Sequence, residues 1–357
     1  MMPQKKQDPP PGNLTATLKS VSRTIYFSFK VLPPDVRLPM SLGYLICRAL
    51  DTAVDSSSAG RAEKKRFLDL VSAIGPGFDP APAAEAAAAF LPGVKHKGER
   101  ELLGSMDFVF KEALRLGGPD LADLREAVTG VASGMEMDLA AFAGGSPAAP
   151  SALSDDDALL RYCDLIGGKP GLFWAGLYQR RLRETLPEAS GLPSARDGGM
   201  IGSALQVTNI LKDAAADLAI GRCYFPSADL AAAGLAPADL RDPASMRKFR
   251  PTVNKWISWA VDQLDICETF VAAIPKSELG MRAAVIWPVY WAMDTLLEVA
   301  KANVLDPRAR PRISKRRVYT TIAATPPLLL SNTAFTRGYR FRRETLIVAI
   351  SGTEAPI

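Results

Sequence analysis

Two stretches of the sequence place pairs of aspartates four residues apart in otherwise apolar surroundings. The first pair is Asp51 and Asp55, and Tyr44 and Arg48 precede it at spacings of four and three residues. On a helix these four side chains share one face. Like charges at this spacing repel each other, more strongly when buried, so we expect a cation between them. Mg²⁺ fits, since it binds one or two carboxylates together with phosphate and water oxygens.

The second pair, Asp213 and Asp217, repeats this arrangement. Gln206 and Asn209 precede it at helical spacing and form one polar face on an apolar stretch. Arg222 follows closely, and its guanidinium suits bidentate contact with phosphate. One such aspartate pair is more often a solvated helix face. Two pairs with amide or arginine partners favour a site that binds a metal ion and an anionic substrate.

These faces need helices to position them, and helices dominate the sequence. Its 357 residues are 48% hydrophobic and 23% charged, and long Ala/Leu-rich stretches repeat apolar residues every three to four positions. Breaks rich in Gly, Pro or Ala occur at 75–82, 144–150, 187–199, 236–243 and 306–311. We predict an all-α fold with a disordered tail at 1–13, one domain at 14–320 and a segment at 321–357 for which the sequence does not predict order.

Composition excludes several other classes of protein. The net charge of +5 favours an anionic partner, and no motif points to nucleic acid. The four cysteines are scattered without paired spacing, and His96 is the only histidine, so a disulfide framework, a zinc site and a histidine-based triad have no support. Without a secretory signal or a long apolar run, we expect a cytoplasmic protein, with at most peripheral contact at the inner face of the membrane.

Taken together, the motifs resemble the squalene/phytoene synthase family in content and in order. The resemblance spans about residues 15–320, and its blocks are 22–23, 48–55, 162–163, 206–217 and 221–226. It implies an isoprenoid-synthase helical bundle around a central cavity. In this fold the two aspartate faces hold Mg²⁺ and ionise a prenyl diphosphate, whose departing charge metal and arginine stabilise.

The resemblance also implies roles for single residues. Asp51, Asp55, Asp213 and Asp217 would bind Mg²⁺ and serve catalysis. Contacts to diphosphate would come from Ser22, Arg23, Tyr44, Arg48, Gln206, Asn209 and Arg222. Tyr162 matches a tyrosine that steadies or deprotonates cationic intermediates, and we expect Glu136 and Asp138 to orient the binding groups. The apolar side chains that would line a dry tunnel include Phe27, Leu172, Phe173, Trp174, Val285 and Trp287.

Within the family, the sequence favours the squalene synthase type. The lead-in Arg48-Ala49-Leu50 and residues 208–213 and 286–288 resemble that branch. This implies head-to-head condensation of two farnesyl diphosphates to presqualene diphosphate, then NADPH-dependent reduction to squalene. A basic stretch would hold the NADPH phosphates through Arg312, Lys315 and Arg316.

Other functions stay open. Residues 134–138 resemble the phytoene or dehydrosqualene branch, and a presqualene diphosphate synthase would stop before reduction. A catalytically silent member could act as a helical lipid-binding or assembly partner. Val54 and Ala216 stand where a third carboxylate is common, which leaves the number of Mg²⁺ ions open. Chain-length preference and oligomeric state are also open.

Overall fold

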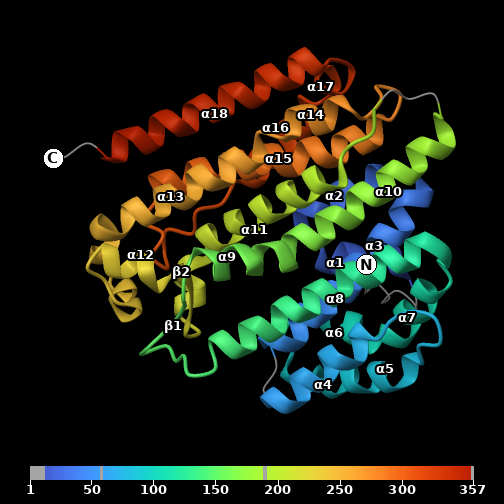
Figure 1. Cartoon of the computed structure of the whole chain (residues 1–357), viewed down its shortest axis with the longest axis horizontal. Helices are drawn as coiled ribbons and strands as arrows, with labels where there is room; N and C mark the ends of the chain where they lie inside the picture. The colour runs from blue at the N-terminus through green and yellow to red at the C-terminus, as the bar shows by residue number, and fades with distance from the viewer. Residues whose placement is uncertain (1–12, 57–58, 188–190, 355–357) are drawn as a thin grey trace, which may run out of the picture.

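A bundle of helices runs along the long axis of the protein, as Figure 1 shows for the computed structural model. The structure describes residues 13–56, 59–187 and 191–354, so most of the tail predicted to be disordered lies outside the described residues. The helices of the first half are Leu14–Val21 (α1), Tyr26–Val31 (α2), Pro34–Ser56 (α3), Arg61–Ser72 (α4), Pro80–Ala89 (α5), Lys97–Gly104 (α6), Met106–Leu114 (α7), Gly118–Ala141 (α8), Asp156–Cys163 (α9) and Lys169–Thr185 (α10).

The second half continues the bundle up to its outermost helix. Its helices are Ala195–Leu218 (α11), Ser227–Ala232 (α12), Met246–Leu264 (α13), Cys267–Ala272 (α14), Leu279–Lys301 (α15), Lys315–Ala323 (α16), Pro326–Leu330 (α17) and Asn332–Glu354 (α18). Two short strands, Ser151–Leu153 (β1) and Arg222–Pro226 (β2), complete the fold. The all-α prediction is confirmed, although the sequence did not predict these strands.

The centre of the bundle is α11, which packs against α10, α13 and α15. A π-helical turn, Asp164–Gly168 (η3), joins α9 to α10 and also packs on α11. The backbones meet at glycines: a Cβ on Gly202 would lie 2.1 Å from the carbonyl oxygen of Gly167. Only residues without a side chain permit this approach, so the glycines bring η3 and α11 together in the wall of one cavity.

A tight turn after α11 positions Arg222. Gly221 adopts φ +87°, and a Cβ there would meet the backbone nitrogen of Ser146 at 2.6 Å. β2 then pairs in parallel with β1, with Ser151 opposite Arg222. The small sheet therefore fixes the backbone of Arg222 close to the end of α11.

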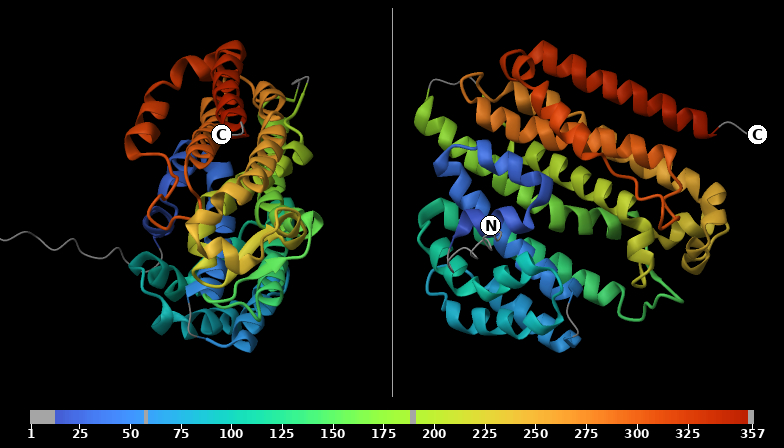
Figure 2. Two further views of the ribbon diagram at one scale, coloured as in Figure 1. Left: turned by 90° about the vertical axis from the view of Figure 1, so that its left-hand side faces the viewer. Right: turned by 180° about the vertical axis from the view of Figure 1, so that it is seen from behind.

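The C-terminal helices extend the same body. Figure 2 shows α18 along one edge, and its buried residues Phe335, Tyr339 and Leu346 belong to the main core. The buried carboxylate of Asp294 on α15 pairs with Arg317 of α16 at 2.7 Å and with Arg342 of α18 at 3.2 Å. Residues 321–354 are thus mostly helical. Among the described residues, no helix combines the length and the apolar character that crossing a membrane requires.

Candidate active site

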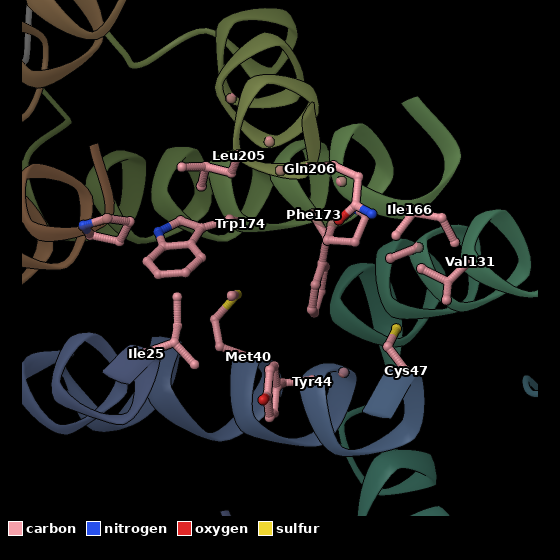
Figure 3. A pocket seen from close by; sticks show the side chains of 18 of the residues that line it. Ile25, Met40, Tyr44, Cys47, Val131, Ile166, Phe173, Trp174, Leu205 and Gln206 are labelled. Carbon is pink, nitrogen blue, oxygen red and sulfur yellow. The ribbon is translucent and has the colours of Figure 1, made fainter. Parts of the chain in front are cut away.

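A cavity of about 410 Å³ lies inside the bundle between α3, α8, η3, α10, α11 and α15. Figure 3 shows Tyr44 and Met40 from α3 pointing toward Phe173, Trp174 and Leu205 on the opposite wall. Most of its lining is apolar, and the polar lining side chains are Tyr44, Arg48, Asp51, Gln206 and Asn209. These five belong to the two aspartate-bearing faces predicted from the sequence.

Along α3, the lining changes from apolar to charged toward the C-terminal end. Arg48 binds Asp51 at 2.6 Å and also the carboxylate of Glu99 on α6. One turn beyond Asp51, the side chain of Asp55 is 40% exposed. The first aspartate face therefore starts inside the cavity and ends at its solvent-exposed rim.

Along α11, the lining changes in the same direction. Gln206 and Asn209 line the cavity, and their amides lie 3.4 Å apart. Asp213 follows one turn later, paired with Lys212 and open to solvent, and Asp217 follows one turn after that in a half-buried position. The second aspartate face thus also passes from cavity to rim.

Arg222 connects the two faces. Its guanidinium donates to Asp55 at 2.6 Å and lies 3.3 Å from Asp138 on α8. Burial opposes its charge, but Asp138 and Asp55 together hold the pKa of Arg222 above its usual value. Arg48, Arg222 and the four aspartates 51, 55, 213 and 217 together form the rim of the cavity.

The rim carries more negative charge than its arginines balance. Burial and the neighbouring Asp55 raise the pKa of Asp51. Burial and then Asp213 raise the pKa of Asp217 to about 8, and Asp55 adds to this effect from the other face. Carboxylates in such surroundings favour a proton or a cation. An added cation would be expected to lower both pKa values.

The donor set fits Mg²⁺. The available ligands are carboxylate oxygens on two faces, and within the described residues no three acidic, histidine or cysteine side chains are close enough to hold a metal ion alone. Mg²⁺ usually keeps open positions for water and phosphate oxygens. Asp51 and Asp55 on one side, and Asp213 and Asp217 on the other, would hold it together with a bound diphosphate.

Tyr162 lies beside the rim at 5% exposure. Its hydroxyl donates to the hydroxyl of Tyr224 at 3.3 Å, and Tyr224 in turn donates to Asp138. Burial, followed by the charge of Asp138, keeps the pKa of Tyr162 well above its usual value, so the phenol stays protonated at neutral pH. The prediction that Asp138 orients other groups agrees with this geometry, whereas Glu136 pairs with Lys65 at the surface.

Some residues predicted for the site lie away from the cavity. The hydroxyl of Ser22, directly after α1, donates to the carbonyl oxygen of Leu18 at 2.5 Å, and the side chain of Arg23 is outside the described part. Arg312 lies just before α16 and Lys315 and Arg316 lie at its start; all three are exposed and do not line the cavity.

Half of the predicted tunnel residues also do not line the cavity. Phe173, Trp174 and Val285 do. Phe27 and Trp287 instead pack in a separate apolar cluster with α16, where the Trp287 indole donates to Thr325 at 2.8 Å. Leu172 lies against Gly199. These three positions are corrected: their apolar side chains serve helix packing.

Three further residues at the site were not predicted. Glu99 holds Arg48, Tyr224 bridges Tyr162 and Asp138, and Lys64 places its ammonium 2.7 Å from the carbonyl of Val54 at the rim. Burial and then the nearby Arg222 lower the pKa of Lys64, and the charges of Asp55 and Asp138 oppose this shift. The only sequence signal was the position of Tyr224 two residues after Arg222, which puts both on one face of a strand.

Comparison with known proteins gives the same family. Squalene/phytoene synthase is the family that matches, over residues 18–317. The presqualene diphosphate synthase of Rhodopseudomonas palustris is 28% identical over 225 residues, and that of Zymomonas mobilis is 29% identical over 223 residues. These alignments cover 62% and 61% of this chain, and 64% and 61% of the relatives, which is under two thirds of their length.

Solved structures support the fold. The complex of TcSQS with the ligand E5700 superposes with a TM-score of 0.70 at 19% identity and covers 96% of this chain and 97% of that one. A dehydrosqualene synthase in complex with a ligand gives a TM-score of 0.58 at 18% identity, covering 91% and 96%. At these identities the likeness establishes the helical architecture.

Proposed function

Because the chain belongs to the squalene/phytoene synthase family of prenyltransferase-type enzymes, we propose that it condenses two farnesyl diphosphates head to head to presqualene diphosphate with Mg²⁺. The observation that carries the proposal is the meeting of two aspartate faces and Arg222 at the rim of an apolar cavity. Two relatives named presqualene diphosphate synthase support this choice of product.

In this proposal the polar side chains at and near the rim bind the diphosphate, and the apolar side chains of the cavity exclude water. Arg48 and Arg222 can each donate two parallel N–H groups to a diphosphate, and Asn209 and Gln206 can orient it by neutral hydrogen bonds. Bound Mg²⁺ would stabilise negative charge on the leaving diphosphate. Phe173, Trp174 and Val285 keep water away from the allylic cation that remains.

The proton balance of the condensation gives Tyr162 its role. One diphosphate leaves, carbon–carbon bonds form between the two chains, and one proton is lost as the cyclopropane closes. The phenol of Tyr162 stays protonated at neutral pH, so its oxygen lone pair can steady positive charge. The departing diphosphate, held by Arg222, is a stronger base and would accept the proton.

Reduction to squalene by NADPH is the second candidate. Within the described residues, Arg312, Lys315 and Arg316 have no ion-pair partner, which leaves three cations available to phosphate groups. These three residues do not line the cavity. Product analysis distinguishes these reactions from three alternatives: phytoene synthesis, dehydrosqualene synthesis, and a catalytically silent protein that binds lipid.

We also propose peripheral contact with an acidic lipid surface, since the hydrocarbon chains of substrate and product are apolar. The large apolar side chains most exposed on α16, α17 and α18 are Tyr319, Leu330, Phe341 and Val348, at 58%, 60%, 68% and 72%. Sedimentation with vesicles of phosphatidylglycerol, but not of phosphatidylcholine, would support this contact. Equal recovery in the supernatant with both would contradict it.

Product analysis tests the proposed reaction. The purified protein is incubated with Mg²⁺ and either farnesyl or geranylgeranyl diphosphate, with and without NADPH, and the products are identified by mass spectrometry. Presqualene diphosphate without NADPH supports condensation, and squalene that appears only with NADPH supports the second step. Turnover restricted to geranylgeranyl diphosphate would contradict farnesyl diphosphate as the substrate. No turnover of any prenyl diphosphate would favour a catalytically silent family member.

A further inference from the structure

Asp138 pairs with two side chains of one strand, through a hydrogen bond from Tyr224 and an ion pair with Arg222. Arg222 and Tyr224 are two residues apart on β2, so both side chains extend from the same face of the strand. The guanidinium lies 3.3 Å from one carboxylate oxygen of Asp138, and the Tyr224 hydroxyl donates to the other. Asp138 is 2% exposed, and a carboxylate at that depth is stable only with such partners.

The chain of contacts continues in both directions. From Arg222 it reaches Asp55 on the rim at 2.6 Å, and from Tyr224 it reaches Tyr162 at 3.3 Å. The two tyrosine rings lie 4.9 Å apart, and the edge of the Phe142 ring packs against Tyr224 at 5.0 Å. This packing limits the rotation of Tyr224, so its hydroxyl stays between Tyr162 and Asp138.

The direction of the hydrogen bonds follows from their chemistry. An ionised carboxylate only accepts hydrogen bonds, so Tyr224 must donate to Asp138 and its oxygen is then free to accept from Tyr162. Consecutive bonds in one direction polarise each other. The Tyr162 oxygen therefore carries more electron density than an isolated phenol, which suits the stabilisation of a nearby cation.

From this geometry we propose that Asp138 is a positioning residue that couples the diphosphate-binding Arg222 to Tyr162 through Tyr224. It acts on both partners at once. On one side it sets the direction of the Arg222 guanidinium, and on the other it fixes the proton and the oxygen of Tyr162. The inference rests on the proposed function, because it assigns the diphosphate to Arg222 and the cationic intermediate to Tyr162.

Two variants separate the effect of Asp138 on Arg222 from its effect on Tyr162. Tyr224→Phe removes the link to Tyr162 but keeps the pairing of Asp138 with Arg222. Asp138→Asn keeps the shape but removes the charge that orients Arg222. Binding of inorganic pyrophosphate with Mg²⁺ is measured by calorimetry, and kcat and KM are measured with farnesyl diphosphate.

The expected pattern is asymmetric. Tyr224→Phe should lower kcat about tenfold and leave KM and pyrophosphate affinity within about twofold. Asp138→Asn should weaken pyrophosphate binding about tenfold or more and lower kcat as well. The double variant should have a kcat no lower than that of Asp138→Asn alone, since residues in one network are not additive.

Another tyrosine–aspartate pair provides matched controls. Tyr339 on α18 donates to Asp265 at 2.9 Å, remote from the cavity lining. Tyr339→Phe and Asp265→Asn should change thermal stability without changing kcat or pyrophosphate affinity. If the Asp138 and Tyr224 variants behave like these controls, their role is structural and the inference is overturned.

The result also separates this inference from the proposed function. Wild-type protein that binds pyrophosphate but does not turn over farnesyl diphosphate would contradict the function, while the comparison with Asp138→Asn would still decide the effect on Arg222. Unchanged pyrophosphate affinity in Asp138→Asn would overturn the coupling. Wild-type protein that binds no pyrophosphate would overturn both.

Discussion

The rim and the apolar floor of the cavity differ in the side chains that form them: the rim is charged and the floor is apolar. The floor, formed by Phe29, Phe173, Trp174, Phe270 and Val285, consists of apolar side chains, of which all but the half-buried Trp174 are buried and stabilise the fold. The rim gathers four aspartates against two arginines and raises the pKa of at least two carboxyl groups. The contrast supports the proposal that the rim binds a cation and an anion from outside the chain, whereas the floor stabilises the protein.

The largest effect should come from removing a rim carboxylate. Asp51→Asn or Asp213→Asn should lower kcat by about three orders of magnitude, because the loss falls on charge that develops in the transition state. Thermal unfolding should show a fold at least as stable as wild type. Asp262→Asn, an exposed carboxylate on α13, serves as control, and near-normal kcat in either rim variant would remove the metal assignment.

Substitutions in the walls of the cavity should lower the stability of the fold, in contrast to the rim variants, which should lower kcat. Gly202→Ala would place a Cβ 2.1 Å from the Gly167 carbonyl oxygen, so η3 and α11 must separate. We expect a loss of about 3 kcal/mol in the free energy of unfolding, measured by urea denaturation. Gly104→Ala, with no atom within 4 Å of its added Cβ, should cost nothing. Equal stability of the two variants would contradict the close packing of these helices.

The stability of the protein should depend on pH because of the rim carboxyl group of Asp217. In the folded protein the pKa of Asp217 is about 8, above the value of about 4 in an unfolded chain. The native state therefore binds a proton more tightly, and this stabilisation is lost as the pH rises through 8. Without Mg²⁺, wild type should lose about 1 kcal/mol of stability between pH 6 and 9 through this half-exposed group.

Asp217→Asn isolates this contribution. The variant should have a flatter stability profile and a higher melting temperature than wild type at pH 9, and added Mg²⁺ should narrow the gap. Melting curves at both pH values, with EDTA and with Mg²⁺, provide the measurement. Parallel profiles for variant and wild type would show that Asp217 does not carry the excess charge of the rim.

The smallest effect should come from the basic residues of α16, which lie outside the rim and the floor of the cavity. Arg316→Ala should raise the KM for NADPH about threefold and leave condensation unchanged, because an exposed cation contributes little to one phosphate contact. Arg337→Ala, an exposed arginine on α18, is the matched control. An equal KM for NADPH in both variants would remove the cofactor role of the α16 residues.

Local patterns made the rim predictable. Spacings of three and four residues put Tyr44, Arg48 and the aspartates of α3 on one face, and the same rule identified α11. Asp138 and Tyr224 meet across 86 residues, and nothing in a single sequence marks such a contact. Trp287 was misplaced because α15 is buried nearly all round, so periodicity does not show which side faces the cavity.

The release of inorganic pyrophosphate tests the central claim most directly. The purified protein receives farnesyl diphosphate and Mg²⁺, and pyrophosphate is counted per molecule of C30 product. Condensation to presqualene diphosphate releases one pyrophosphate per product, and reduction to squalene with NADPH releases a second. We predict a ratio of one without NADPH and no release with EDTA or with Asp51→Asn. Release that persists in that variant, or none by wild type, would contradict the rim as the site of diphosphate ionisation.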